Sequence, residues 1–257
     1  MINKLYFSPT GSTKNVVELI AGVWEGEQQE VDFSILEKDY SACTFAPDDI
    51  CLIGVPSFGG RVPTIAAQHL EKMKAASTPT ILVVTYGNRD YDDTLLELKN
   101  IVKQSGFNVI AAIAAVTEHS IMHQFGTGRP DALDRKELLE FAQKIKEETK
   151  NPATFSDVVV KGNMPYKEYL GLPFKPSANK NCNNCGACAK SCPVGAIPAK
   201  TPSQTLNDRC ITCMRCVSIC AQHARNINPA LLFVAGKKMQ KACGGRKLNY
   251  CFFGEKR

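Results

Sequence analysis

The chain has 257 residues, a length that favours two ordinary domains over one large one. Residues 1–150 carry 15 basic and 21 acidic side chains (net −6) and residues 151–257 carry 16 and 4 (net +12), which sum to +6. Hydrophobic residues make up 44%, as in globular proteins. No apolar run approaches the ~20 residues of a membrane helix, and residues 1–8 contain no secretory signal, so we expect a cytoplasmic protein without a membrane span.

Apolar runs and amphipathic stretches alternate through residues 1–150. The predicted strands are Ile2–Phe7, Glu30–Ile35, Ile50–Val55, Thr80–Thr85 and Phe107–Val116. The predicted helices are Lys14–Trp24, Thr64–Lys74, Asp92–Gln104 and Pro130–Thr149, the last with Leu133, Leu138, Phe141 and Ile145 facing inward. This alternation predicts an α/β fold with a doubly wound, five-stranded parallel sheet.

Ligands of such sheets bind beyond the carboxyl ends of the strands, so the loops there are informative. The first loop offers small hydroxyl residues and a glycine, whose backbone can close around an anion at a helix N-terminus. It lacks the GK[ST] ending of a P-loop and the GxGxxG pattern. An ordinary capped helix is the alternative. The candidate phosphate-binding residues are Ser8, Thr10, Gly11, Ser12 and Thr13.

Two further loops at the same end of the sheet each place an aromatic residue beside glycine. A flat ring could lie between Phe58 and Tyr86, with loop backbone facing its edge; ordinary turns are the alternative. The candidate ring-binding residues are Pro56, Ser57, Phe58, Gly59, Gly60, Tyr86, Gly87, Asn88, Arg89 and Tyr91.

A fourth segment, residues 118–131, leaves the last predicted strand. His119 and His123 have a helical i, i+4 spacing that suits a metal, but no third ligand is evident. The segment is expected to lie over the bound ring or to face a partner; a solvent loop without a role is the alternative.

On these loops, residues 1–150 resemble the flavodoxin family. The resemblance implies a flavodoxin-like sheet of strand order 2-1-3-4-5 that binds FMN. Many flavodoxins have acidic residues around the flavin, whereas this chain has Arg61 and Arg89 there. Cationic groups near the ring would ease its reduction.

The segment that follows, residues 151–177, is expected to be a connector. We expect it to pack on the first domain through Tyr166, Tyr169, Leu170 and Phe174. After it, a cysteine pattern occurs twice, and each copy is a C-x2-C-x2-C-x3-C run. The first copy is Cys182, Cys185, Cys188 and Cys192, and the second is Cys210, Cys213, Cys216 and Cys220. The two runs are an internal duplication.

Three closely spaced thiolates can hold three corners of a [4Fe–4S] cube, and in two-cluster proteins the fourth cysteine of each run ligates the other cluster. We therefore assign one cluster to Cys182, Cys185, Cys188 and Cys220, and the other to Cys210, Cys213, Cys216 and Cys192. Zinc favours pairs of CxxC, and disulfides suit short secreted chains; both are weaker alternatives.

Residues 178–228 resemble bacterial-type two-cluster ferredoxins, with Pro193 after the first run and Ala221 in place of the second proline. Cys43 and Cys51 are expected to be buried apolar residues. Residues 229–257 form a basic tail, in which Cys243 and Cys251 are not expected to be ligands.

The whole chain resembles fused flavodoxin–ferredoxin proteins of anaerobic bacteria and archaea. The resemblance implies electron transfer between FMN, two [4Fe–4S] clusters and a redox partner, a ferredoxin-linked donor or acceptor enzyme. An FMN-dependent reductase of a small acceptor and a redox- or oxygen-responsive sensor are the alternatives. Docking of the acidic domain on the basic one would shorten the electron path. A homodimer is left open, and nucleic acid is not an expected partner.

Overall fold

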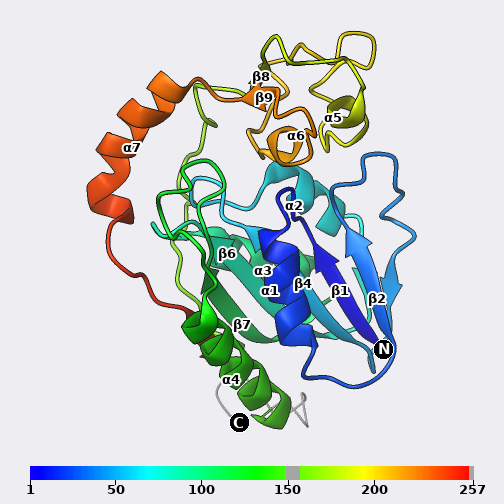
Figure 1. The fold of residues 1–257 in the computed structure, drawn as a ribbon. Helices are drawn as coiled ribbons and strands as arrows, with labels where there is room; N and C mark the ends of the chain where they lie inside the picture. Colours follow the sequence, from blue (N-terminus) through cyan, green and yellow to red (C-terminus); the bar gives the residue numbers. More distant parts are fainter. Residues whose placement is uncertain (149–156, 255–257) are drawn as a thin grey trace.

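The computed structural model describes residues 1–148 and 157–254, which form a large part built on one sheet and a smaller cysteine-rich part above one edge of that sheet (Figure 1). The expected end of one helix at Thr149, the start of the connector at 151–156 and the last residues of the tail, 255–257, lie outside the described residues. The main strands are β1 (Ile2–Tyr6), β2 (Gln28–Asp32), β4 (Ile50–Pro56), β6 (Pro79–Tyr86), β7 (Asn108–Val116) and β10 (Tyr250–Phe253). The helices of the large part are α1 (Ser12–Ala21), α2 (Thr64–Leu70), α3 (Thr94–Gln104) and α4 (Ala132–Glu148).

The six-stranded sheet has the order β10-β7-β6-β4-β1-β2. Its first five strands along the chain, β1, β2, β4, β6 and β7, pair in parallel. Numbered one to five, they have the spatial order 2-1-3-4-5, which is the flavodoxin-like order. The expected fold class is therefore confirmed. A short parallel pair, β3 (Thr44–Phe45) and β5 (Lys74–Ala75), lies apart from the main sheet.

Helices cover both faces of the sheet, as its strands require. β6 is buried along its whole length and β4 along its centre, because each strand places side chains on two covered faces. Helices α1 and α4 pack with one core cluster and α2 and α3 with the other. In α4, Leu138 and Ile145 are buried as predicted, but Leu133 is 69% exposed, so the prediction for this residue is wrong. Leu133 lies in the first turn, beyond the reach of the sheet.

The cysteine-rich part folds as two copies of one motif. Each copy has a short helix, α5 (Ala187–Lys190) or α6 (Arg215–Ser218), and the antiparallel strands β8 (Ser177–Ala178) and β9 (Arg225–Asn226) join the ends. Left-handed backbone occurs at equivalent positions of the two cysteine runs. These pairs are Asn184 with Thr212, Gly186 with Met214, and Gly195 with His223. The duplication seen in the sequence is thus a duplication of backbone conformation.

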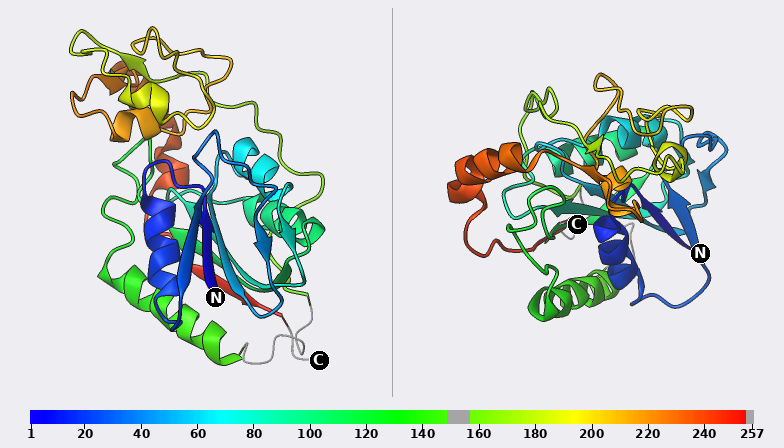
Figure 2. Two further views of the ribbon diagram at one scale, coloured as in Figure 1. Left: turned by 90° about the vertical axis from the view of Figure 1, so that its right-hand side faces the viewer. Right: turned by 45° about the horizontal axis from the view of Figure 1, so that its top comes forward.

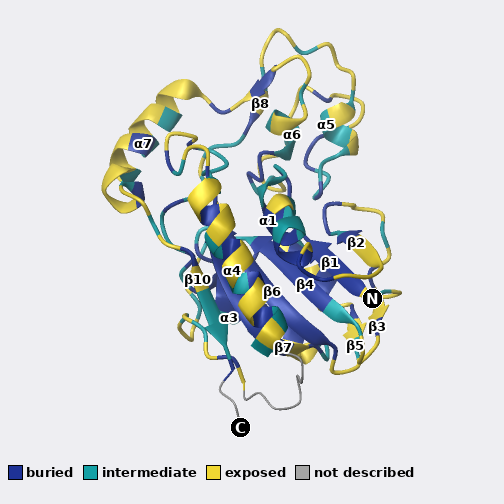
Figure 3. Ribbon diagram, turned by 60° about the horizontal axis from the view of Figure 1, so that its bottom comes forward, coloured by how far each residue is buried: buried dark blue, intermediate teal, exposed yellow. Residues whose placement is uncertain are grey.

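The C-terminal segment folds back onto the large part rather than trailing as a tail. Helix α7 (Pro229–Cys243) runs along the side of the molecule, and β10 adds an antiparallel sixth strand beside β7 (Figures 1 and 2). Most of α7 is exposed, whereas the central strands β1, β4, β6 and β7 are mostly buried (Figure 3). No helix among the described residues is long and apolar enough to cross a membrane.

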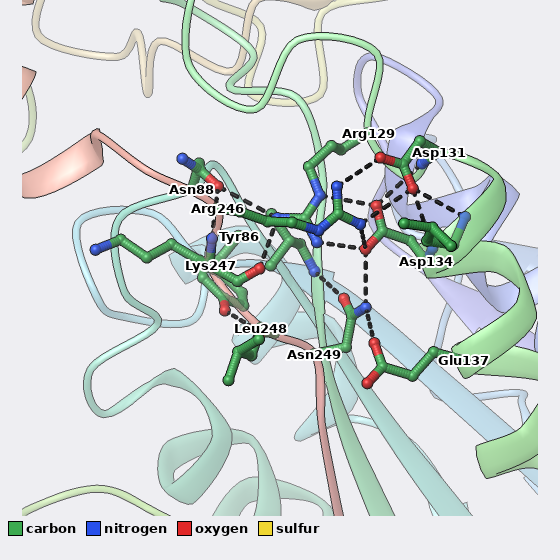
Figure 4. A network of polar contacts seen from close by, with 12 residues as sticks. Tyr86, Asn88, Arg129, Asp131, Asp134, Glu137, Arg246, Lys247, Leu248 and Asn249 are labelled. Carbon is green, nitrogen blue, oxygen red and sulfur yellow. Dashed lines mark hydrogen bonds and ion pairs between the residues drawn. The ribbon is translucent and has the colours of Figure 1, made fainter.

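A buried polar network holds the turn between α7 and β10 (Figure 4). Asn88 Nδ2 donates to the carbonyl oxygens of Cys243 and Gly245 at 2.7 and 2.8 Å. Arg129 pairs with the buried Asp134 and donates to the carbonyl oxygen of Lys247 at 2.7 Å. The C-terminal segment is therefore fixed to the loops that follow β6 and β7.

The connector contacts the large part through ion pairs from Lys161 and Lys167, through the buried Val158 and through two tyrosines. The Tyr166 ring lies under the Arg61 guanidinium, with 5.1 Å from Cζ to the ring centroid, and its hydroxyl accepts a hydrogen bond from Asn100. Tyr169 is half-buried against Gly59. Leu170 is 90% exposed, so the expectation that it packs on the first domain is wrong.

Candidate functional site

The loops after β1, β4 and β6 converge on one pocket at the carboxyl edge of the sheet, which we call the loop pocket. Of the candidate residues, it is lined by Thr10, Ser12, Thr13, Pro56, Ser57, Phe58, Tyr86 and Gly87. The sequence argument that these loops share one rim is therefore matched by their positions. The loop pocket is also lined by Thr117, Glu118, His119, Ser120 and Cys213.

The first loop leaves donors available at the start of α1. Gly11 precedes the helix in the left-handed region, at φ 91°, and offers no side-chain cap. Ser8 Oγ turns inward instead and accepts a hydrogen bond from the backbone N–H of Lys14 at 2.9 Å. The hydroxyls of Thr13 and Thr85, which both line the pocket, form a hydrogen bond to each other at 2.8 Å. Hydroxyls and helix-start amides are the groups that bind phosphate.

A second, neighbouring cavity of about 230 Å³ lies between the sheet edge and the cysteine-rich part, and we call it the interdomain pocket. Both pockets include Ser57, Phe58, Gly87, His119 and Ser120, so they adjoin. The remaining walls come from six segments that are far apart in the sequence. They include Gly59, Arg89, Met122, Tyr169, Phe174, Ile211, Thr212 and Met239.

Five candidate residues, Ser8, Gly11, Gly60, Asn88 and Tyr91, line neither pocket. Two of them hold the C-terminal segment instead. Asn88 bonds to its carbonyls, and the Tyr91 ring lies 6.2 Å from the Tyr250 ring. The hydroxyl of Tyr86 donates to Leu248, although Tyr86 also lines the loop pocket.

The two arginines that distinguish this chain are both paired with carboxylates. Arg61 donates to both carboxylate oxygens of Glu97 at 2.7 and 2.8 Å and does not line either pocket. Arg89 lines the interdomain pocket but pairs with Asp92. The net positive charge that the pockets receive is therefore smaller than the sequence indicates.

His119 is the main pocket residue that the sequence left without a defined role. Burial lowers its pKa to about 4, helped by the charges of His123 and Arg89. Its Nδ1 accepts the backbone N–H groups of Ile121 and Met122, both at 3.2 Å, so the neutral ring carries its proton on Nε2. Gly87 permits this position, because a Cβ there would lie 2.8 Å from His119 Cγ. His123, by contrast, is exposed and pairs with Glu118.

A third cavity, the cysteine cavity, is lined by Cys192, Cys210, Cys213 and Cys216, the four residues assigned to one cluster. Burial, together with the smaller effect of the neighbouring thiols of Cys192 and Cys210, raises the pKa of Cys213 to about 12 and of Cys216 to about 11. Buried thiolates that repel one another are stable only beside a cationic group, which is what a metal cluster supplies.

Of the other four cysteines, Cys185 is exposed, whereas Cys182, Cys188 and Cys220 are half-buried, as are Cys192, Cys210 and Cys216. The backbone N–H groups of Ala196 and Ala224 point at Cys192 Sγ and Cys220 Sγ, at 3.2 and 3.3 Å. Amides aimed at sulfur are typical of iron–sulfur sites. Among the described residues, no group of three His, Cys, Asp or Glu side chains is arranged to hold a single metal ion.

Two residues belong to neighbouring sites at once. Cys213 lines both the loop pocket and the cysteine cavity, and Ile211 lines both the interdomain pocket and the cysteine cavity. Cys213 is also part of the core cluster of the large domain.

Among the described residues, no ion pair joins residues 1–148 to residues 178–228. The two parts meet through apolar contacts there. The ion pairs to acidic side chains of the large part come instead from basic residues of the connector and of the C-terminal segment.

A flavodoxin-like sheet joined to a cysteine-rich duplication defines an electron-transfer protein. Residues 181–225 match the family model of the 4Fe-4S dicluster domain. The chain thus joins a sheet of flavodoxin-like strand order to a segment that matches a 4Fe–4S dicluster domain. A search of curated proteins gives no match.

Among solved structures, a flavodoxin from Streptococcus pneumoniae is 15% identical, with a TM-score of 0.40, covering 58% of this chain and 99% of that one. The two-electron reduced flavodoxin of Megasphaera elsdenii is 21% identical, with a TM-score of 0.36 and coverages of 56% and 99%. Rubredoxin oxygen:oxidoreductase from Desulfovibrio gigas is 14% identical, with a TM-score of 0.42 and coverages of 59% and 36%. The fold assignment rests on the strand order above.

Proposed function

We propose that the protein carries electrons between FMN, two [4Fe–4S] clusters and a redox partner. The FMN domain is residues 1–150, the connector 151–177, the cluster domain 178–228 and the C-terminal segment 229–257. The observation that carries the proposal is the position of Cys213, which lines both the loop pocket and the cysteine cavity.

The loop pocket and the interdomain pocket together fit FMN. Thr10, Ser12 and Thr13 supply hydroxyls for the phosphate at the start of α1. Phe58 and Gly59 supply an aromatic surface and a close backbone for the ring in the interdomain pocket. Flavin exchanges one or two electrons, and the protein's part is to orient it and to set its potential.

The cysteine cavity fits one cluster on Cys210, Cys213, Cys216 and Cys192. We assign the second cluster to Cys182, Cys185, Cys188 and Cys220, none of which lines the loop pocket or the interdomain pocket. Electrons would pass between the flavin site and the nearer cluster across Cys213 and Ile211, because these two residues separate the cavities.

The exposed Cys185 gives the outer cluster access to a partner. Residues 178–228 contain six basic residues and one acid, Asp208, a net of +5 before any cluster is bound. Two clusters of about −2 each would bring this net charge to about +1. We infer that the partner is a redox protein that docks at this face.

A reductase of a small acceptor is the second candidate, because the loop that follows β7 forms a wall of both pockets through His119 and Ser120. The neutral His119 would offer an Nε2–H donor to such an acceptor. A carrier, in contrast, exchanges electrons with a protein and turns over no small molecule.

The test uses the full chain, purified without oxygen. FMN, iron and sulfide are measured, with an expected content of one flavin and about eight irons per chain. Cys213→Ser should lose about half of the iron and slow electron exchange between the flavin and the remaining cluster. Cys51→Ser, a buried cysteine in the sheet, is the control and should keep all eight. Zinc in place of iron, or no bound flavin, would contradict the proposal.

A further inference from the structure

One arginine lies inside the cysteine-rich part with almost no contact with solvent. Arg225, in β9, is 1% exposed and is among the largest completely buried side chains of the protein. One terminal nitrogen of its guanidinium donates to Thr205 Oγ1 at 2.8 Å. The other donates to the carbonyl oxygens of Gln204, at 2.8 Å, and Pro202. Its Nε is buried without a hydrogen-bond partner in the described structure.

These partners are all neutral. In the described part of the chain, no carboxylate pairs with Arg225, and Asp208, the one acid of residues 178–228, is exposed. A buried charge without a counter-charge costs several kcal/mol even after relaxation. The fold therefore indicates that a negative charge belongs beside Arg225.

The neighbours of Arg225 are cysteines from both proposed clusters. The guanidinium of Arg225 is near enough to the Cys216 and Cys220 thiols for its charge to act on both. The carbonyl oxygen of Pro202, which accepts from Arg225, also lies 3.5 Å from Cys188 Sγ. Cys216 belongs to the nearer cluster, and Cys188 and Cys220 belong to the outer one, so Arg225 lies between the two sets.

The internal duplication shows that the fold itself does not require a charge at this position. Ile197 follows Cys192 at the same spacing at which Arg225 follows Cys220, so the two residues are equivalent in the two copies. Ile197 is 5% exposed. An apolar side chain therefore fills the equivalent site in one half of the motif. The arginine in the other half needs an electrostatic reason, since burying it is costly.

We propose that Arg225 is a counter-charge common to the two clusters and that it raises the reduction potential of both. This inference rests on the proposed cluster binding. Each cluster becomes more negative by one charge when it accepts an electron, and a fixed positive charge in a poorly screened interior stabilises the reduced form. The hydrogen bonds to Pro202, Gln204 and Thr205 hold the guanidinium in place.

The experiment compares three variants of the full chain, purified without oxygen. Arg225→Gln removes the charge and keeps a polar side chain, and Arg225→Lys keeps the charge. Arg209→Gln removes the same charge from an exposed position of the same domain. Iron and sulfide content are measured first. Cluster reduction is then followed by electron paramagnetic resonance during an anaerobic redox titration, which reports potential rather than activity.

At the potential that half-reduces the wild-type clusters, Arg225→Gln should lower the ratio of reduced to oxidised cluster about tenfold, equal to 59 mV for a one-electron couple. Arg225→Lys should move it less, and Arg209→Gln should leave it near the wild-type value, because solvent screens an exposed charge. Loaded clusters with unchanged potentials in Arg225→Gln would overturn the inference and leave the proposed function intact.

Arg225→Gln could instead fail to assemble clusters. Clusters restored by Arg225→Lys would then show that the charge is required, in support of the inference. Clusters absent from Arg225→Lys as well would show that the arginine's shape alone is needed, and would overturn it. Wild-type protein without iron would contradict the proposed function itself.

Discussion

The ring of Tyr169 lies directly against Gly59: a Cβ at residue 59 would be 2.1 Å from Tyr169 Cδ2. Gly59 also has a φ of +63°, which an L-residue rarely adopts. The missing side chain therefore lets the connector close over the loop that follows β4. This contact forms one wall of the interdomain pocket.

We predict that Gly59→Ala lowers the free energy of unfolding by about 2–3 kcal/mol, about 1 from backbone strain and the rest from displacement of Tyr169. Gly171→Ala is the matched control, because Gly171 has φ +83° but only Lys175 Nζ, at 3.8 Å, near its Cβ position. It should lose only the strain. Urea titrations measure both, and equal losses would show that Tyr169 moves away at no cost.

The pattern of the sheet could be predicted because it is local. The buried run of β4 and the amphipathic spacing of α1 lie within single segments, and each predicted element is found within a few residues of its expected bounds. Strand β10 could not be predicted in this way. It is a short strand, Tyr250–Phe253, in a basic segment, and its partner β7 belongs to a part of the chain that ends at Val116, far earlier in the sequence.

The same reason separates the site residues that the sequence located from those it did not. Cysteine ligands are specified by spacing within one run, so Cys210, Cys213 and Cys216 could be grouped from sequence. Asn88 was assigned to the ring because of its loop, but its amide bonds the C-terminal turn. That partner, Cys243, is distant in the sequence, and no local pattern indicates it.

Asn88→Gly should release the C-terminal segment. Glycine keeps the left-handed backbone of residue 88, at φ 57°, and removes the side chain that donates to Cys243 and Gly245. Loss of these buried bonds should cost about 2–3 kcal/mol. Hydrogen exchange of residues 243–249 should become faster. Asn184→Gly, also at φ 57° but exposed, should leave exchange in that segment unchanged; equal rates in both variants would contradict the role of the Asn88 amide.

Glu30 should give the outer strand β2 an acid-sensitive attachment. Its carboxylate accepts from Lys4 Nζ, Lys14 Nζ and the Tyr6 hydroxyl at 2.8–2.9 Å, and these bonds lower its pKa to about 2. A lowered carboxyl pKa stabilises the fold above the unfolded value of about 4.5, and the benefit is lost as the pH falls to about 2.

Glu30→Gln should therefore reduce stability by about 1 kcal/mol at pH 7, a value discounted because the side chain is partly exposed. The difference from wild type should disappear near pH 2. Glu140→Gln, whose partner Lys136 is 3.9 Å away on the surface, should have little effect at any pH. Urea midpoints from pH 2 to pH 7 measure this, and a difference that persists at pH 2 would contradict it.

His69 should make the fold less stable in mild acid. The ring is 5% exposed, both nitrogens lack hydrogen-bond partners in the described structure, and it stacks on Tyr40 with centroids 4.0 Å apart. Burial, aided by the charge of Lys72, lowers its pKa to about 4 from 6.5. The unfolded chain thus binds this proton more readily, so stability is complete above pH 6.5 and falls by about 3 kcal/mol towards pH 4.

His69→Phe keeps the stacked ring and removes two unsatisfied polar atoms. It should raise stability by about 1 kcal/mol at pH 7 and should remove the His69 part of the decline between pH 6.5 and pH 4. His123→Gln, which changes an exposed imidazole, should leave that decline in place. Thermal and urea unfolding across this range measure both effects. If His69→Phe declines as steeply as wild type, His69 is protonated equally in the folded and unfolded states, and another group causes the acid sensitivity.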